Sequence, residues 1–246
     1  MKTASLLLIL GLLMAGATVS QATLSSWQNE VNAGTPPAAT LFATTSGSSP
    51  IIFNVGNLSG DSSFEFIVHS GPFGASQALM GTQNPATGQQ GLKFEQWQET
   101  GMYGITDFGL VDHVSTIPYD TNRDVHIVFT SDGLTTNMYI DGAFSYNFGV
   151  GMRMTGNQGL AAATNATETA FFDLMDGNII GFASYDSALS PAEITDHFDA
   201  FTVVPEPASV TLIALGCLAS IRRRRSVTLV KTAATVQIQP IPITTV

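Results

Sequence analysis

Residues 125–148 read VHIVFTSDGLTTNMYIDGAFSYNF, which is three short apolar segments separated by two Asp-Gly turns. Each segment is rich in β-branched and aromatic residues, which suit a pleated and half-buried surface. Glycine supplies the positive φ that a tight hairpin turn needs, so Gly133 and Gly142 mark two chain reversals. The stretch therefore predicts a three-stranded antiparallel meander.

Segments on both sides of this meander show the same strand pattern. Gly, Pro, Ser and Asn bound four further apolar runs, at residues 51–55, 64–68, 92–97 and 178–185. One helix is well signalled, because Ser190 and Glu193 form a capping box with Pro191 at the first helical position. Many strands and one late helix predict an all-β antiparallel sandwich with a short C-terminal helix.

Two of these stretches resemble laminin-G-like domains. RDVHIVF at 123–129 with TNMYIDG at 136–142 is similar to the central hairpin of that family, and FASYDSALSPAEI at 182–194 to its closing strand and helix. The resemblance covers residues 40–200 and implies a concanavalin A-like jelly roll over residues 23–202. Lectins, adhesive modules and glucanases share this fold, so the fold alone decides no function.

Residues 1–22 have the pattern of a cleaved export signal. Lys2 is a positive start, residues 6–15 are apolar, and Ser20 and Ala22 are small residues at positions −3 and −1 of a cleavage site. As a helix the apolar run is about 15 Å long, too short for a hydrocarbon core of about 30 Å. A cleaved signal is therefore preferred over an uncleaved anchor or a buried helix.

Residues 203–225 place a Pro-Glu-Pro tripeptide before an apolar segment at 208–221 and an arginine cluster. The tripeptide is Pro205, Glu206 and Pro207, and the cluster is Arg222, Arg223, Arg224 and Arg225. The prolines hold the tripeptide extended, and the arginines keep their side of a membrane in the cytoplasm.

This order resembles the PEP-CTERM sorting signal of Gram-negative bacteria. The resemblance implies an exosortase, a membrane cysteine transpeptidase or protease, as the processing partner. It also implies a cell-envelope or surface location, membrane anchoring before processing, and a link to exopolysaccharide and biofilm. A plain single-pass anchor is the alternative, and the tail at 226–246 has no predicted role.

The charge of the chain is concentrated in its middle. The chain has 246 residues with 19 acidic and 9 basic side chains, a formal net charge of −10. Between residues 23 and 204 there are 18 acidic and 3 basic residues, which gives −15. Such a charge argues against a nucleic-acid partner. The one cysteine, Cys217, lies in the apolar segment, so the exported domain folds without disulfides.

No catalytic motif is present. A glycosidase needs two carboxylates about 5–9.5 Å apart, and the Glu-x-Asp-x-x-Glu pattern of concanavalin A-like glucanases is absent. Glu95 and Glu99 on one strand would lie about 13 Å apart, and Asp173 and Asp176 suit a strand end. The four histidines lack zinc spacing, and His126 is expected to be structural.

Two kinds of ligand remain open. Laminin-G-like domains often bind calcium at the sheet rim, and Asp132, Asp141, Asp173 and Asp176 stand at predicted strand ends with the oxygen ligands that calcium prefers. Ordinary Asp-Gly turn chemistry is the preferred alternative.

An exposed aromatic ring can stack on a pyranose while amides bind its hydroxyls. Gln96, Trp97 and Tyr103 are the candidates, and packing in the core is the preferred alternative.

Two functions from different classes follow. The preferred function is a non-catalytic exported surface or matrix protein with a laminin-G-like module that binds carbohydrate or protein. Its expected partners are an exosortase, a membrane through the C-terminal segment, and a polysaccharide or a surface protein. The alternative is a secreted glycoside hydrolase or lyase of concanavalin A-like fold with a nonstandard site.

Overall fold

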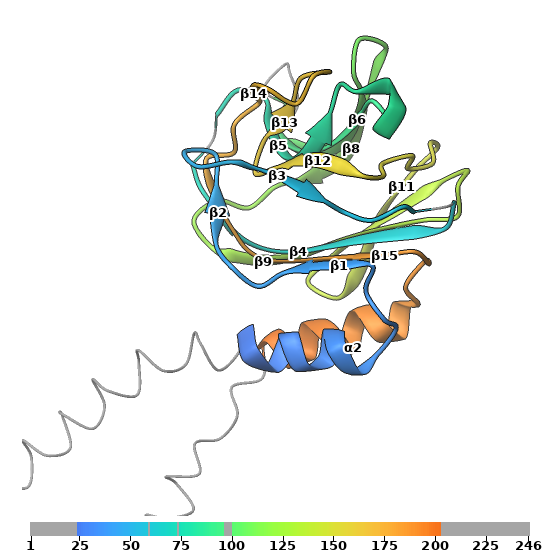
Figure 1. Cartoon of the computed structure of the whole chain (residues 1–246). Coiled ribbons are helices and arrows are strands. Elements are labelled where there is room, and N and C mark those ends of the chain that lie inside the picture. Colours follow the sequence, from blue (N-terminus) through green and yellow to red (C-terminus); the bar gives the residue numbers. More distant parts are fainter. Residues whose placement is uncertain (1–23, 59, 73, 96–99, 203–246) are drawn as a thin grey trace, which may run out of the picture. The chain divides into compact units, whose positions relative to one another are not determined.

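The computed structural model describes residues 24–58, 60–72, 74–95 and 100–202 (Figure 1). The predicted export signal at 1–22, the sorting signal at 203–225 and the tail at 226–246 lie outside these residues. Within the described ranges, no helix combines the length and the apolar character that crossing a bilayer requires.

Two β-sheets packed face to face form the body of the described domain (Figure 1). Sheet A consists of β1 (Ala39–Leu41), β2 (Thr45–Ser46), β4 (Ser62–Ser70), β9 (Asp124–Ser131), β10 (Thr136–Ile140), β11 (Ala143–Phe148) and β15 (Gly177–Tyr185). Sheet B consists of β3 (Ile51–Asn54), β5 (Gln77–Thr82), β6 (Gln90–Glu95), β7 (Met102–Asp107), β8 (Val111–Pro118), β12 (Asn157–Leu160), β13 (Ala163–Thr164) and β14 (Phe171–Phe172). A 3-10 turn, η1 (Pro85–Thr87), joins β5 to β6.

The strand order confirms the predicted antiparallel sandwich. Sheet A runs β1-β15-β4-β9-β10-β11 with β2 beside β15, and sheet B runs β14-β13-β5-β6-β7-β8 with β12 between β3 and β5. Of the strand pairs in the described residues, β5 with β13 is parallel and the others are antiparallel. Strands far apart in the sequence, such as β4 and β15, are therefore neighbours in one sheet.

The predicted meander is β9, β10 and β11 at one edge of sheet A. Ile140 pairs with Ile127 on β9 and with Ala143 on β11, so the chain reverses at both Asp-Gly turns. Gly133 and Gly142 have φ values of 80° and 76°, the left-handed region that glycine enters without strain.

The core of the sandwich follows from the two-residue period of its strands. On β4 the side chains of Phe64, Phe66 and Val68 enter the core between the sheets, while Glu65 points to the opposite face. Sheet B contributes its own alternate positions to the same core: Leu92, Phe94, Tyr103 and Ile105. Each sheet therefore also has an outer face, and these two outer faces differ.

Helices cover the outer face of sheet A. The predicted C-terminal helix is α2 (Pro191–Thr202), and its capping box is confirmed. The backbone N–H of Ser190 donates to Glu193 Oε2 at 2.9 Å, and the backbone N–H of Glu193 donates to Ser190 Oγ at 3.3 Å.

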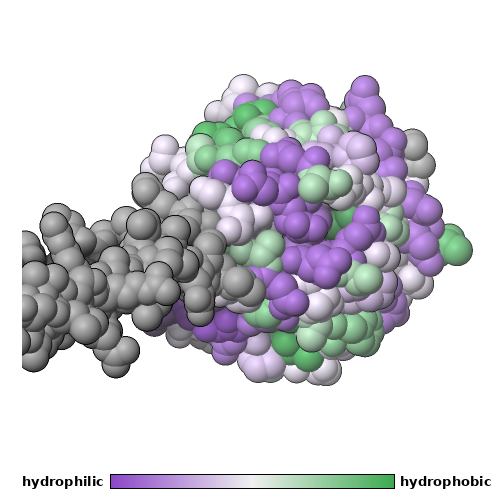
Figure 2. All heavy atoms as spheres, turned by 90° about the horizontal axis from the view of Figure 1, so that it is seen from below, coloured by the Kyte–Doolittle hydropathy of each residue, from purple (hydrophilic) through white to green (hydrophobic). Residues whose placement is uncertain are grey.

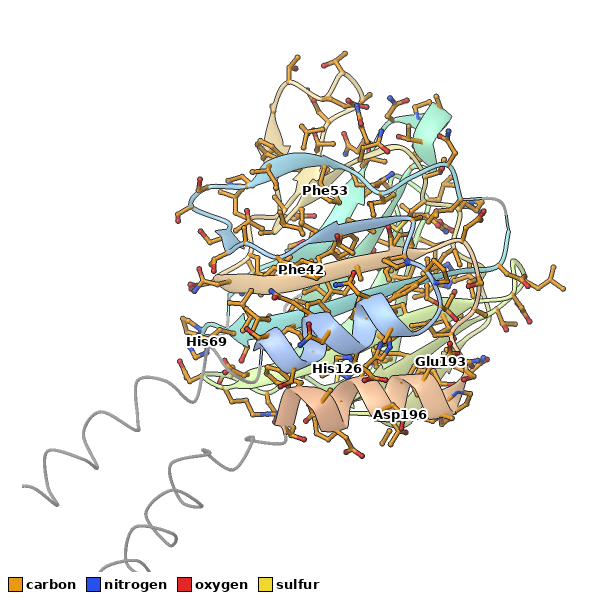
Figure 3. The ribbon with its side chains drawn as sticks, turned by 60° about the horizontal axis from the view of Figure 1, so that its bottom comes forward. Phe42, Phe53, His69, His126, Glu193 and Asp196 are labelled. Atoms are coloured by element: carbon orange, nitrogen blue, oxygen red, sulfur yellow. The ribbon has the colours of Figure 1, made fainter. Side chains whose placement is uncertain are left out.

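A second helix, which was not predicted from the sequence, spans residues 24–33 and lies beside α2 (Figure 3). Leu24, Trp27 and Val31 recur at spacings of three and four, which gives the helix an apolar stripe toward the sheet. Thr35, just after this helix, donates from Oγ1 to Glu193 Oε1 of α2 at 2.5 Å. From below, the helix-covered face is largely hydrophilic, with apolar residues in separate patches (Figure 2).

Candidate functional site

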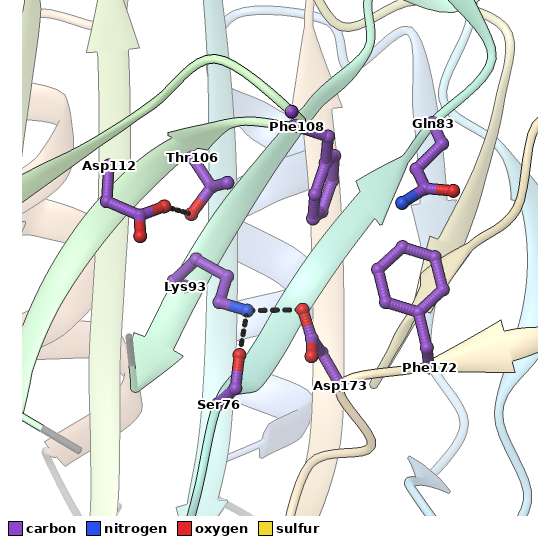
Figure 4. Close-up of a pocket in the computed structure, with 9 residues that line it drawn as sticks. Ser76, Gln83, Lys93, Thr106, Phe108, Asp112, Phe172 and Asp173 are labelled. Atoms are coloured by element: carbon purple, nitrogen blue, oxygen red, sulfur yellow. Dashed lines mark hydrogen bonds and ion pairs between the residues drawn. The ribbon is translucent and has the colours of Figure 1, made fainter. Parts of the chain in front are cut away.

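The outer face of sheet B carries a pocket. Lys93 and Thr106 alternate with core residues on β6 and β7, so their side chains point away from the sandwich core. The pocket above them has a volume of about 280 Å³. Nine of the described residues line it (Figure 4): Ser76, Gln83, Lys93, Thr106, Phe108, Gly109, Asp112, Phe172 and Asp173. We refer to this site as the Lys93 pocket.

Two glycines shape the sheet beneath the pocket. Gly81 on β5 pairs with Gly91 on β6, and the ring of Phe108 lies against both. A Cβ atom on Gly91 would approach Phe108 Cζ to 2.8 Å, closer than real contacts, so this ring position requires glycine. Phe108 meets Phe172 edge-to-face with ring centroids 5.3 Å apart, and the two rings form an apolar wall.

A buried ion pair borders the pocket opposite these rings. Lys93 Nζ donates to Ser76 Oγ at 2.7 Å and to Asp173 Oδ2 at 2.5 Å (Figure 4). The Lys93 side chain is 2% exposed and that of Asp173 is 15% exposed. A buried ammonium is tolerated only with such partners, and the pair reaches solvent on the carboxylate side.

The remaining polar groups face the same space. Thr106 Oγ1 donates to Asp112 Oδ1 at 2.8 Å, and Gln83 stands beyond the aromatic rings (Figure 4). The pocket therefore combines aromatic rings with hydroxyl, amide and carboxylate groups. Such a set binds the apolar face and the hydroxyl groups of a saccharide.

Of the predicted sugar-binding residues, the structure describes Tyr103, which does not line this pocket. Gln96 and Trp97 lie outside the described residues. Tyr103 is 1% exposed and packs in the core against Phe94 and Tyr119, and burial raises its pKa. A ring in this position offers no face to a ligand, so the preferred alternative of core packing describes Tyr103.

Two predicted calcium ligands serve the meander turns instead. Asp132 Oδ1 accepts from the backbone N–H groups of Leu134 and Thr135, and these hydrogen bonds lower the pKa of Asp132. Asp141 Oδ1 accepts from the backbone N–H of His126, and its Oδ2 pairs with an Arg123 nitrogen at 2.8 Å. They lie at opposite ends of β10, which agrees with turn chemistry.

The other two predicted calcium ligands lie in the loop before β15. Asp173 is the partner of Lys93 in the pocket, and the backbone N–H of Asp176 donates to Gln77 Oε1 at 2.7 Å. Among the described residues, no group of three or more His, Cys, Asp or Glu side chains is arranged to hold a metal ion. Calcium binding by this domain therefore stays a prediction.

A second polar cluster is enclosed between sheet A and the helices. Glu65 accepts at Oε1 from Trp27 Nε1 at 2.6 Å and from His126 Nε2 at 2.7 Å. At Oε2 it accepts from Tyr185 Oη at 2.7 Å and from His197 Nδ1 at 3.0 Å. These five residues, from helix 24–33, β4, β9, β15 and α2, are the Glu65 cluster.

The donors keep Glu65 ionised inside the protein. Burial alone would raise its pKa, but the hydrogen bonds from His126 and His197 outweigh burial and lower the pKa far below the usual range. Burial also opposes protonation of His197, and Glu65 reverses that effect and raises the pKa of His197. Every member of the cluster is at most 2% exposed, so it holds the helices to the sheet and has no opening for a substrate.

Sequence reasoning located the pocket only in part. Lys93, Thr106 and Phe108 are close in sequence to the predicted sugar-binding residues, and Asp173 is one of the predicted calcium ligands. Ser76, Gln83 and Phe172 were missed, because only the pairing of β5, β6, β13 and β14 brings them together. Glu65 was missed although a signal existed, namely a charged residue inside the apolar run FEFIV. His126 was expected to be structural, and its buried place in the Glu65 cluster confirms this.

Comparisons with known proteins give distant similarities. No family model matches the chain, and no curated protein matches its sequence. Domain 4 of AbnA, an extracellular GH43 arabinanase from Geobacillus stearothermophilus in complex with arabinotriose, is 18% identical, with 63% of this chain and 74% of that chain covered and a TM-score of 0.47.

Two sialidase structures are also similar to this chain. The CBM40 of Ruminococcus gnavus IT-sialidase bound to α2,3-sialyllactose is 12% identical, with 65% of this chain and 97% of that chain covered and a TM-score of 0.49. Trypanosoma rangeli sialidase in complex with sialic acid is 12% identical, with a TM-score of 0.44, and the match covers 60% of this chain and 24% of that enzyme.

Proposed function

We propose that this protein is a non-catalytic exported surface or matrix protein whose jelly-roll domain binds saccharide in the Lys93 pocket. We further propose that the domain is laminin-G-like and that an exosortase processes the chain at the sorting signal. The observation that carries the binding function is the composition of the pocket wall. Phe108 and Phe172 face a buried Lys93–Asp173 pair across a space of about 280 Å³.

The pocket chemistry suits a sugar ring better than an apolar ligand. One pyranose needs an aromatic surface for its C–H face and several hydrogen-bonding groups for its hydroxyls. The two phenylalanines supply the first, while the exposed Gln83 and Asp112 supply donors and acceptors in the lining. Because these polar groups lie on two sides of the pocket, they can fix the orientation of a single pyranose ring.

Glycan binding by the full chain tests this proposal. We expect the protein to bind to glycans on an array, and we expect Phe172→Ala to lower its affinity for them. Phe144→Ala is the control, because it removes the same ring from β11 of sheet A, where Phe144 is 60% exposed and lies outside the pocket. Equal binding by the wild type and Phe172→Ala would reject the pocket as the binding site.

The proposed sorting rests on the sequence of residues 203–225. Alanine at Pro205, Glu206 and Pro207 is expected to block the mass change that processing produces in the native host. Pro240→Ala, which changes a proline in the tail, is the control and should be processed as the wild type is. Unchanged processing of the triple variant would leave a plain anchor as the function of this end.

The alternative function, a carbohydrate-active enzyme, retains one supporting observation. Two carboxylates, Asp112 and Asp173, border the same pocket, and glycosidases work with a carboxylate pair. Release of reducing ends from polysaccharides discriminates the two functions. Turnover that Asp112→Asn abolishes would establish the enzyme, whereas saturable binding without turnover supports the binding protein.

A further inference from the structure

We propose that the Lys93 pocket selects saccharides that carry a protonated amino group over acidic saccharides. This inference rests on the proposed saccharide-binding function and assigns a substrate class to the same site. The juxtaposition that points to it is two carboxylates, Asp112 and Asp173, in the lining of one pocket that holds a single buried ammonium.

The ammonium of Lys93 is already neutralised. Its side chain is 2% exposed, and its nitrogen lies 2.5 Å from Asp173 Oδ2 and 2.7 Å from Ser76 Oγ. A carboxylate from a ligand would have to displace Asp173, which would leave that aspartate without its cation in a confined site. Lys93 therefore orients Asp173 and does not serve as a receptor for an acidic sugar.

Asp112 carries a charge that no cation balances within the described structure. Its Oδ1 accepts from the neutral hydroxyl of Thr106, and no ion pair among the described residues includes it. Asp112 is exposed and lines the pocket. An ammonium group bound there would form a charge-assisted hydrogen bond.

The rest of the domain adds no positive charge that could receive an acidic polysaccharide. Arg123 is paired with Asp120 and Asp141, and Arg153 is paired with Asp107. With Lys93 these are the three basic residues between 23 and 204, against 18 acidic ones. The field of the domain therefore repels polyanions and attracts polycations, most strongly at low salt.

Calorimetry with three tetrasaccharides on the full chain tests the inference. The probes are a glucosamine tetramer, its N-acetylated form, and a galacturonic acid tetramer, at a pH where the amine is protonated. We expect the glucosamine tetramer to bind at least about tenfold more tightly than the acetylated form, the ratio that one hydrogen bond to a charged group supplies. We expect the galacturonic acid tetramer to bind most weakly.

Two aspartate variants distinguish the effect of the pocket carboxylate from the effect of the negative charge of the whole domain. Asp112→Asn should reduce the ratio between the glucosamine and acetylated tetramers to near one. Asp196→Asn removes the same charge from an exposed position on α2, on the helix-covered side, and should leave the ratio unchanged (Figure 3).

The outcomes distinguish this inference from the proposed function. Binding of the galacturonic acid tetramer as tightly as the others, lost in Phe172→Ala, would overturn the charge selectivity and leave the binding function in place. A ratio that survives Asp112→Asn would show that the pocket carboxylate does not cause the selectivity and would overturn the inference. Binding of none of the three probes, with no response on a wider glycan array, would reject both.

Discussion

Each outer face of this sandwich carries a buried charged side chain, but the partners of the two charges differ in their access to solvent. On sheet A, Glu65 receives hydrogen bonds from four side chains on four other elements, and two helices cover it. On sheet B, Lys93 is as deeply buried, yet its partner Asp173 borders an open space of about 280 Å³.

This difference separates architecture from binding. A buried charge whose partners all come from the protein fixes the arrangement of those partners and leaves nothing for a ligand to add. A buried charge whose partner faces a cavity orients acceptors toward an incoming molecule. The Glu65 cluster therefore explains why the helices lie where they do, and the Lys93 pocket is the site that we propose for saccharide binding.

The largest expected effect is the loss of the Glu65 carboxylate. Glu65→Ala leaves the donors of Trp27, His126, Tyr185 and His197 unpaired in a dry site, so we expect the free energy of unfolding to fall by about 3–5 kcal/mol. Urea denaturation followed by tryptophan fluorescence measures this loss.

Glu65→Gln is the matched variant for this prediction. It preserves the shape and one acceptor oxygen, so it should cost less than Glu65→Ala. Equal stability of Glu65→Ala and the wild type would contradict the structural role of the cluster and remove the contrast between the two faces.

A smaller loss of stability is expected at the pocket. Lys93→Met removes the buried ammonium but keeps its apolar stem, and Asp173, already 15% exposed, can be solvated through the pocket. We expect the free energy of unfolding to fall by about 1–3 kcal/mol, together with a loss of glycan binding. A loss as large as that of Glu65→Ala, with binding retained, would mean that Lys93 is architectural as well.

The pH dependence of stability should carry the signature of the Glu65 cluster. The pKa of Glu65 is lowered from 4.5, so its contribution is present above that pH and is lost as the pH falls. Burial would lower the pKa of His197, but Glu65, with help from Glu30 and Glu193, raises it above 6.5. The contribution of His197 to the free energy of unfolding is therefore present below pH 6.5 and is lost as the pH rises. We therefore expect maximal stability between pH 4.5 and 6.5.

Thermal denaturation across this pH range measures the profile. His197→Asn should flatten the decline on the alkaline side. His69→Asn, at a half-exposed pair with Asp124, should leave that decline in place. A decline that persists unchanged in His197→Asn would show that other groups cause it.

The fold of this protein could be predicted from the sequence better than its pocket could, for a physical reason. The signals for the meander and for helix α2 are local in the sequence. The turn Asp141-Gly142 and the capping box of Ser190 and Glu193 each need only residues that are a few positions apart. The pocket depends on register, since Gly81 must lie opposite Gly91 before Phe108 can rest on both. Helix 24–33 also carries a local signal, because Leu24, Trp27 and Val31 have helical spacing.

The smallest expected change in stability is also the most specific probe of the pocket. Gly91 lies on β6 without a positive φ, so alanine suits its backbone, but the new Cβ would stand 2.8 Å from Phe108 Cζ. The ring must therefore move into the pocket, while the Lys93–Asp173 pair and the Glu65 cluster are untouched. We expect Gly91→Ala to lower glycan affinity about two- to tenfold, the range in which a displaced aromatic contact falls, with little change in the urea midpoint. A variant that binds normally would show that Phe108 does not contact the ligand, and one that unfolds would show that the two outer faces are not energetically separate.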